Sequence, residues 1–203
     1  MNTIKKFLLG ANIFNRKAEN RPRKHRLVLP LVIITGLMLS FTVQAEGPVP
    51  YQFKLVPASD AINACLPKAS ATVMIFPKGE LRGVDTLDLK AEGLPPNTAF
   101  TVFLTNLANI PFGASQYIAE FTTNEAGRGG VRVDAIIEEA FAIVGGVPGR
   151  QELNHIVIWF ADPAGDDVCF GPGGGPVTPF DGDGQAGGTV LSSKNFLPGA
   201  PLP

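Results

Sequence analysis

Residues able to do acid–base or metal chemistry are scarce in the body of this chain, residues 46–203. Its single histidine, His155, lies in the apolar run 154–161 beside Trp159. Zinc and copper sites built from several histidines are therefore excluded within one chain. Ser115 lacks a nucleophile elbow, because Tyr117 stands where the closing glycine belongs. We expect His155 to be a packed strand residue, and a hydrolase built on Ser115 or paired carboxylates is the least favoured function.

Two acidic turns form the best candidate metal site, a calcium site. Asp181 and Asp183 stand two residues apart in a glycine-rich turn, which suits a hard cation with oxygen ligands. The bidentate glutamate of an EF-hand is missing, because Ser192 takes its place. The second acidic turn supplies three more carboxylates, those of Asp162, Asp166 and Asp167. Solvated turns, in which aspartates cap their own backbone, are the other interpretation, and no other cofactor is predicted.

The chain has two cysteines, Cys65 and Cys169, which bracket nearly all of the strand-like sequence. In an exported protein an even pair predicts a disulfide. Such a bridge would close a loop of about 100 residues and stabilise the fold by very roughly 4–5 kcal/mol in the chain-entropy model. The alternatives are two free thiols or a metal pair, and a metal site needs more ligands than two distant cysteines.

The charges of the chain are unevenly placed. Residues 1–45 hold eight basic side chains and one acidic side chain, so residues 46–203 carry a formal charge of −8. A body this acidic repels phosphate backbones and anionic lipid surfaces. We therefore expect no nucleic-acid partner, and contact with a membrane only through the N-terminal segment.

The N-terminal segment has the pattern of a signal peptide. A basic stretch ends at Arg26, an apolar run covers residues 27–43, and small residues at Val43 and Ala45 suit a signal peptidase. We expect cleavage after Ala45. The alternative is an uncleaved anchor, because 17 apolar residues approach the length that spans a bilayer. Either way the body is expected outside the cytoplasm, in the periplasm or the extracellular space.

The rest of the chain reads as short strands separated by turns. Alternating or β-branched runs predict strands at 71–76, 86–92, 98–106, 116–123, 130–136 and 154–161, with a last short strand at 189–191. Residues 124–127 predict a hairpin loop. One helical turn is expected at 60–64 within a polar lead-in, and two turns of helix at 138–144. The run 156–160 is apolar on both faces, so segment 138–144 or the tail should cover its outer side.

These elements predict three regions and an all-β fold. The regions are a targeting segment at 1–45, a β domain at 46–170 and a partly docked tail at 171–203. Of the last 33 residues 15 are Gly or Pro, which argues against a second packed domain. Six or seven short strands indicate an antiparallel β-sandwich of immunoglobulin-like or Greek-key type, with an open barrel as the alternative.

The stretches LDLKAEGLPPNTAFTVFLTN and AEFTTNEAGRGG resemble the strand–turn–strand pattern of secreted bacterial β-sandwich domains. Over about residues 70–135 the layout is similar to that of CHRD and Cu/Zn-superoxide-dismutase-like sandwiches and of the extracellular part of anti-sigma-K-type proteins. The copper-zinc branch places several histidines on the strand after the turn. Here Phe100, Val102, Phe103 and Leu104 stand there instead, so the resemblance implies the fold and not the metal chemistry.

The functional prediction is a non-enzymatic envelope or secreted protein with a binding or structural role and an unidentified protein or glycan partner. A calcium-stabilised extracellular module is the alternative. A broad exposed aromatic patch would favour binding. The residues that could build one are Tyr51, Phe53, Phe103, Phe112, Tyr117, Phe180 and Phe196. In an all-β domain, however, most phenylalanines belong to the core.

Overall fold

A computed structural model describes residues 47–78, 83–178 and 184–203, which belong to one compact unit. The predicted targeting segment lies outside these ranges. Eight antiparallel strands form one sheet in the order β5-β4-β9-β10-β1-β2-β3-β6. They are β1 (Tyr51–Pro57), β2 (Ser70–Phe76), β3 (Asp85–Glu92), β4 (Ala99–Thr105), β5 (Ser115–Thr122), β6 (Gly129–Ala135), β9 (His155–Phe160) and β10 (Thr189–Ser192). The all-β antiparallel prediction is confirmed.

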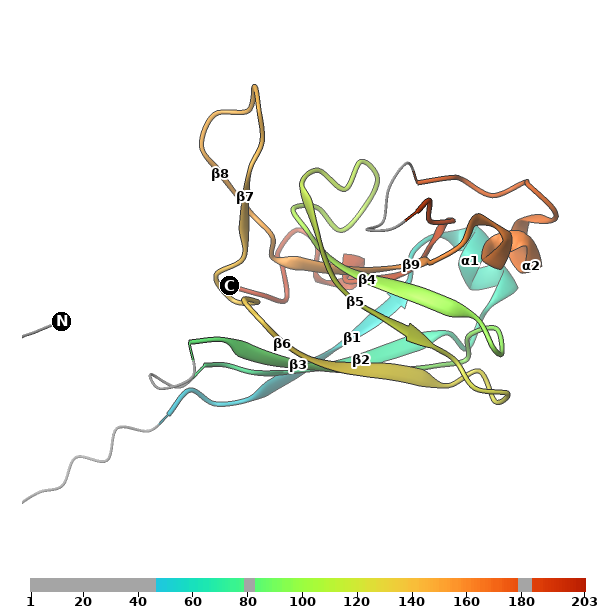
Figure 1. Cartoon of the computed structure of the whole chain (residues 1–203), viewed down its shortest axis with the longest axis horizontal. Helices are drawn as coiled ribbons and strands as arrows, with labels where there is room; N and C mark the ends of the chain where they lie inside the picture. Colours follow the sequence, from blue (N-terminus) through green and yellow to red (C-terminus); the bar gives the residue numbers. More distant parts are fainter. Residues whose placement is uncertain (1–46, 79–82, 179–183) are drawn as a thin grey trace, which may run out of the picture. The chain divides into compact units, whose positions relative to one another are not determined.

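The sheet folds over on itself into two layers, which makes it a sandwich close to a closed barrel (Figure 1). One layer holds β1, β2, β3 and β6, and the other holds β5, β4, β9 and β10. The layers join where β1 pairs with β10 through Val56↔Ser192 and Pro57↔Leu191. At the other side β5 and β6 lie against each other without forming a ladder. The predicted hairpin therefore keeps its turn, closed by Asn124 N–H donating to Arg128 O, while its strands diverge into different layers.

Period-two alternation sorts the side chains between the core and the solvent. In β2 and β3, Val73, Ile75, Leu87 and Leu89 point inward and are fully buried. The opposite layer contributes Phe100, which packs on Phe121 and Phe160 at ring-centroid distances of 5.5 and 5.1 Å. Each buried side chain of this size contributes roughly 1.5–3 kcal/mol. One apolar layer between the two halves therefore holds the fold together.

The second face of β9 is also covered, as its apolar sequence predicts. Val157 and Trp159 pack with Phe103, Phe112 and Ala186. Trp159 meets Phe103 and Phe112 edge-to-face at 4.8 and 4.9 Å. The cover comes from the 106–114 loop and the tail. Segment 138–144 has no part in this cluster.

Segment 138–144 is not helical, so that prediction is wrong. It forms β7 (Phe141–Ile143), which pairs with β8 (Arg150–Glu152) in a two-stranded hairpin. The pairing with β8 gives the physical reason. Phe141, Ala142 and Ile143 pair with Glu152, Gln151 and Arg150, and Ala140 O accepts the N–H of Leu153 at 3.0 Å, so the backbone groups that a helix would need are used in the hairpin. The buried carboxylate of Asp85 fixes the turn before β7, because its Oδ2 accepts the N–H groups of Ile137 and Glu138, both at 2.9 Å.

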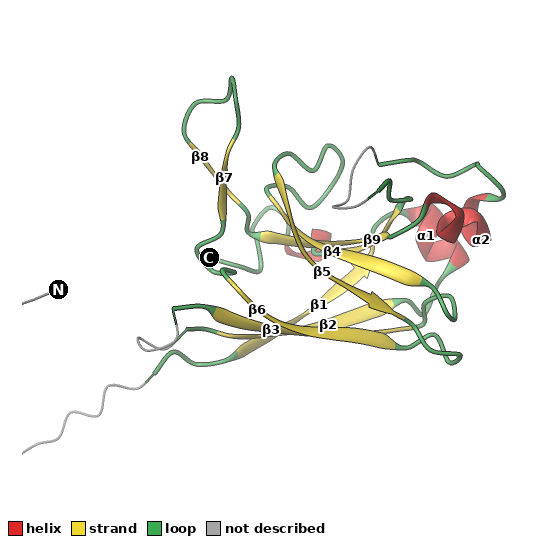
Figure 2. Cartoon of the chain, viewed as in Figure 1, coloured by secondary structure: helices red, strands yellow, loops and turns green. Residues whose placement is uncertain are grey.

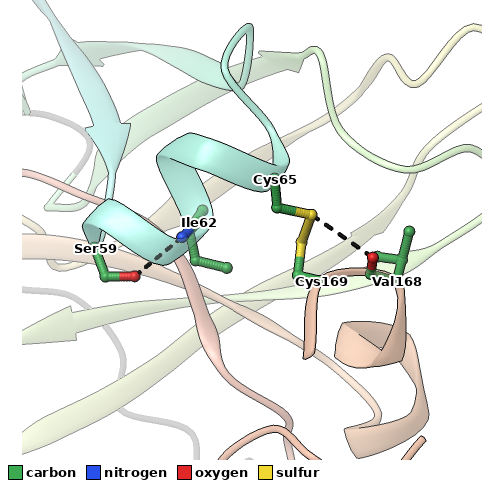
Figure 3. Close-up of a disulfide and its surroundings, with 5 residues drawn as sticks. All are labelled: Ser59, Ile62, Cys65, Val168 and Cys169. Carbon is green, nitrogen blue, oxygen red and sulfur yellow. Dashed lines mark hydrogen bonds between the residues drawn. A yellow bond between two sulfur atoms is a disulfide. The ribbon is translucent and has the colours of Figure 1, made fainter. Parts of the chain in front are cut away.

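The predicted lead-in 46–64 contains β1, a central strand, as well as the expected helical turn. That turn is α1 (Asp60–Cys65), which begins at Ser59, whose Oγ accepts from Ile62 N–H at 3.2 Å (Figure 3). Beyond β9 come a 3₁₀ turn (Pro163–Asp166) and α2 (Asp167–Phe170). A second 3₁₀ turn, Lys194–Phe196, follows β10. Among the described helices none is long and apolar enough to cross a membrane.

Cys65 at the end of α1 and Cys169 in α2 lie at disulfide-bonding distance, which is the predicted pairing (Figure 3). The bridge joins positions 104 residues apart. It fastens the segment after β1 to the segment after β9. The lead-in and the tail are therefore tied together at one end of the sandwich.

Replacing both cysteines, Cys65→Ala with Cys169→Ala, is expected to lower the free energy of unfolding by about 4–5 kcal/mol, because the loop constraint on the unfolded chain is lost. Urea unfolding at neutral pH measures the difference. The wild type with reductant serves as the control and should match the double variant. A difference below about 1 kcal/mol would contradict the expectation.

Candidate functional site

The acidic turns use their carboxylates to cap local backbone. Asp162 Oδ1 accepts a hydrogen bond from Ala164 N–H at 2.7 Å, and Asp167 Oδ1 accepts one from Gly173 N–H at 2.8 Å. Asp181 and Asp183 lie outside the described residues. Within the described ranges no group of three His, Cys, Asp or Glu side chains is placed to hold a metal ion. Calcium therefore remains a prediction, without a convergent ligand set among these three carboxylates.

Asp166 differs from its neighbours because its carboxylate is buried, with 1% of the residue exposed. Oδ2 accepts the N–H of Gly188, while Oδ1 has no hydrogen-bond partner in the described part of the chain. Glycines surround this group. A Cβ at Gly175 would lie 2.0 Å from Oδ1, and one at Gly187 would lie 2.8 Å from Oδ2. The carboxylate thus holds the tail against the end of β9.

Burial raises the pKa of the Asp166 carboxyl group, because the charged form loses its hydration. The Gly188 hydrogen bond acts in the opposite direction, and the nearby charge of Asp167 raises the pKa further. The folded state therefore binds a proton at this site more tightly than the unfolded chain does. Asp166 is a structural carboxylate whose charge costs stability at neutral pH.

His155 does not meet Ser115. The two residues are separated by Thr105, which pairs with both across β5, β4 and β9. His155 Nδ1 lies 2.9 Å from Ser193 Oγ, and that oxygen also accepts the N–H of Ile156 at 3.2 Å. His155 and Ser193 are both buried, and burial lowers the pKa of His155. This pair joins β9 to the end of β10.

The aromatic side chains do not form one exposed face. Phe53 and Phe103 are buried, and Phe196 packs edge-to-face on Phe53 at 5.6 Å. Tyr117 is exposed, with its ring 5.9 Å from Phe103. Phe180 lies outside the described residues. Most of this predicted binding set therefore belongs to the core or to its cover.

A groove of about 780 Å³ crosses the outer face of the β1-β2-β3-β6 layer, and we call it the outer groove. Its lining combines small residues with long polar side chains. Its main lining residues are Gln52, Ser70, Thr72, Met74, Asp88, Lys90, Glu92, Asn124, Arg128, Gly130 and Arg132. Because β2 and β3 have neighbours on both sides, their backbone groups are used in ladders and the groove presents side chains.

The outer groove gathers three basic and two acidic side chains, Lys90, Arg128 and Arg132 with Asp88 and Glu92, on an acidic body. Lys90 and Arg128 are exposed and have no ion-pair partner among the described residues. Arg132 lies 3.4 Å from Asp88 Oδ2, and its guanidinium lies 5.2 Å from the centre of the Phe76 ring. Sequence patterns at single strands did not reveal this site. The site is formed by the outward-facing residues of β1, β2, β3 and β6. They can be recognised as one group only when the order of the strands in the sheet is known.

A second surface feature is the β7–β8 hairpin, which stands away from both layers (Figure 2). Its tip, residues 142–149, has no charged side chain, and Ile143 is 72% exposed. At its base the Arg150 guanidinium lies 4.4 Å from the centre of the Phe141 ring. A smaller hollow there is lined by Gln116, Ile136 and Glu139 together with the hairpin.

The chain was compared with protein-family models, with curated proteins and with solved structures, and none of them matches it.

The stability of the wild type relative to an Asp166→Asn variant is expected to fall as pH rises. The pKa of Asp166 is higher in the folded state than the value of 3.8 in the unfolded chain. Protonation of Asp166 therefore contributes fully to the free energy of unfolding below pH 3.8, and this contribution is lost as pH rises through the folded pKa. Urea unfolding of both proteins across the acidic range measures this difference. Equal pH slopes for the two proteins would contradict it, because the variant cannot titrate at this site.

Gly175→Ala is expected to destabilise the fold by about 1–3 kcal/mol, the usual cost of overpacking. The reason is that the added methyl group would overlap the Asp166 carboxylate. Gly145→Ala is the matched control, since a Cβ there meets nothing within 4 Å. Thermal melts of both variants test this, and equal melting temperatures would refute the crowding around Asp166.

Proposed function

We propose that this protein is an exported, non-enzymatic binding protein that holds an envelope or extracellular partner in the outer groove. The observation that carries the proposal is the groove itself. Of the nine basic residues in the body, Lys90, Arg128 and Arg132 line it. These basic side chains gather on one face of a body with charge −8. Basic side chains spread over the whole surface would serve solubility equally well, so their gathering supports recognition of a ligand.

The chemistry of the groove supports binding over hydrolysis. It contains two carboxylates, Asp88 and Glu92, which stand four residues apart on one strand. At about 3.4 Å per residue they are roughly 14 Å apart. Carboxylate pairs that cleave glycosidic bonds are about 5–9.5 Å apart. Asp88 is also ion-paired with Arg132 at 3.4 Å.

Export is part of the proposal and is supported by two features. The N-terminal pattern of basic residues, apolar run and small residues suits a signal peptide. The Cys65–Cys169 pair at bonding distance suits an oxidising compartment. The kinship with CHRD and superoxide-dismutase-like sandwiches is proposed for the fold only. Phe100, Val102 and Leu104 fill the core where the copper-zinc branch has histidines.

The proposal is tested by filling the groove. Thr72 lies on β2 between Lys54 and Lys90 in adjacent strands, with its side chain on the outer face. Thr72→Trp should block the groove without touching the core. Cell-envelope material of the producing organism, separated into polysaccharide and protein fractions, is passed over the immobilised wild type. We expect one fraction to be retained, and its retention to fall at least tenfold on the Thr72→Trp protein.

Thr122→Trp is the matched control, because Thr122 is exposed at the end of β5 in the other layer. It should retain the same fraction as the wild type. Equal retention by the Thr72→Trp protein would place the binding surface elsewhere. Failure of the wild type to retain either fraction above an inert column would refute a binding function.

A further inference from the structure

We infer that the outer groove contains an anion subsite at Gly130, which binds the carboxylate of a hexuronic acid within an acidic glycan. The inference rests on the proposed function and names the ligand class of the same groove. Three cations surround the subsite, and they are Lys90, Arg128 and Arg132. The carboxylate would lie above Gly130, where no side chain occupies the surface.

The strand register sets this arrangement. Alternate residues of a strand share a face, so Arg128, Gly130 and Arg132 lie in sequence along one side of β6, roughly 7 Å apart. Lys90 of β3 is the direct partner of Gly130 in the neighbouring strand. The position without a side chain therefore has an arginine before it, an arginine after it and a lysine opposite it.

Glycine is required at position 130 by a close backbone approach. A Cβ there would lie 2.2 Å from the carbonyl oxygen of Leu89. Position 130 therefore adds no side chain to the space between Lys90, Arg128 and Arg132. A planar carboxylate suits it, because arginine donates two parallel hydrogen bonds to such a group and lysine donates a further one.

The remaining groove residues favour a sugar over a peptide. An extended peptide is held mainly by backbone hydrogen bonds to a free strand edge. The groove crosses β2 and β3, which have none, and the outer edge of β6, the end strand of the sheet, lies against β5. Sugar hydroxyl groups instead need donors and acceptors on side chains. Gln52, Ser70, Thr72 and Asn124 supply amides and hydroxyls, and Glu92 supplies a carboxylate acceptor without an ion-pair partner among the described residues.

The charge of the whole body limits the ligand further. With a formal charge of −8 on residues 46–203, a densely charged polyanion is repelled over most of the surface. Asp88 partly neutralises Arg132, while Lys90 and Arg128 have no ion-pair partner within ranges 47–78, 83–178 and 184–203. A glycan with carboxylates on some of its sugars matches this balance better than a polyphosphate or a heavily sulfated chain.

The test uses short oligosaccharides of a hexuronic acid, neutral hexose oligosaccharides of the same length, and an acidic peptide of the same charge. Binding to the purified protein is measured by calorimetry at low ionic strength and again with added salt. We expect the hexuronate to bind most tightly and to weaken as salt screens the cations. Lys90→Gln and Arg128→Gln should each weaken hexuronate binding roughly tenfold.

Lys54→Gln is the matched control, since Lys54 lies on the same sheet face two strands from Lys90 and the substitution changes the charge equally. It should change hexuronate affinity less than about threefold. Neutral sugar or peptide binding as tightly as hexuronate, or equal losses in the Lys54 and Lys90 variants, would overturn the anion subsite. The groove function would still stand if Thr72→Trp abolished that binding. Hexuronate binding that survives Thr72→Trp would overturn both.

Discussion

The burial of one shared layer of apolar side chains between two halves of a single sheet is the constraint on which the rest of this structure depends. Leu55, Val73, Leu89, Phe100 and Phe160 meet there and are removed from water. Because side chains alternate along each strand, filling this layer assigns every remaining strand residue to an outer face. One outer face is therefore wet and polar, and the other must be covered. The outer groove lies on the polar face, and the cluster around Trp159 lies on the covered face.

The covered face explains why the glycine- and proline-rich tail belongs to the fold. Trp159 and Val157 need a lid, and the tail brings Ala186 to them before it enters the sheet as β10. Asp166 holds this path in place by accepting the N–H of Gly188, and Gly175 leaves room for the carboxylate. The fold thus keeps a buried carboxylate where a glycine-rich segment turns into the sheet. On the opposite face the outward side chains of β3 and β6 are mostly polar, so no lid is needed.

Local alternation was enough to predict β2, β3, β4, β5, β6 and β9, because each shows a clear apolar side or a β-branched run. Strand β1 was missed even though Tyr51, Phe53 and Leu55 alternate with Gln52 and Lys54, since prolines on both sides suggested an extended lead-in. The helix expected at 138–144 did not form because residues 141–143 pair with 150–152, a segment that local periodicity does not connect to them. The cysteine pairing could be predicted because the chain has only two cysteines and was expected to be exported. The outer groove was not, because Lys90 and Gly130 become neighbours only when β3 and β6 pair.

The position of β10 has a consequence for how the chain acquires its structure. This strand is the last of the described strands along the chain, yet it lies in the middle of the sheet between β9 and β1. Until it arrives, the two layers have no ladder between them and the first strand has one unpaired edge. Completion therefore requires contacts that span most of the sequence, a topology associated with slow folding. A chain cut before residue 189 would lack β10, the strand that joins the two layers. Only a chain that includes β10 can therefore form the complete sheet.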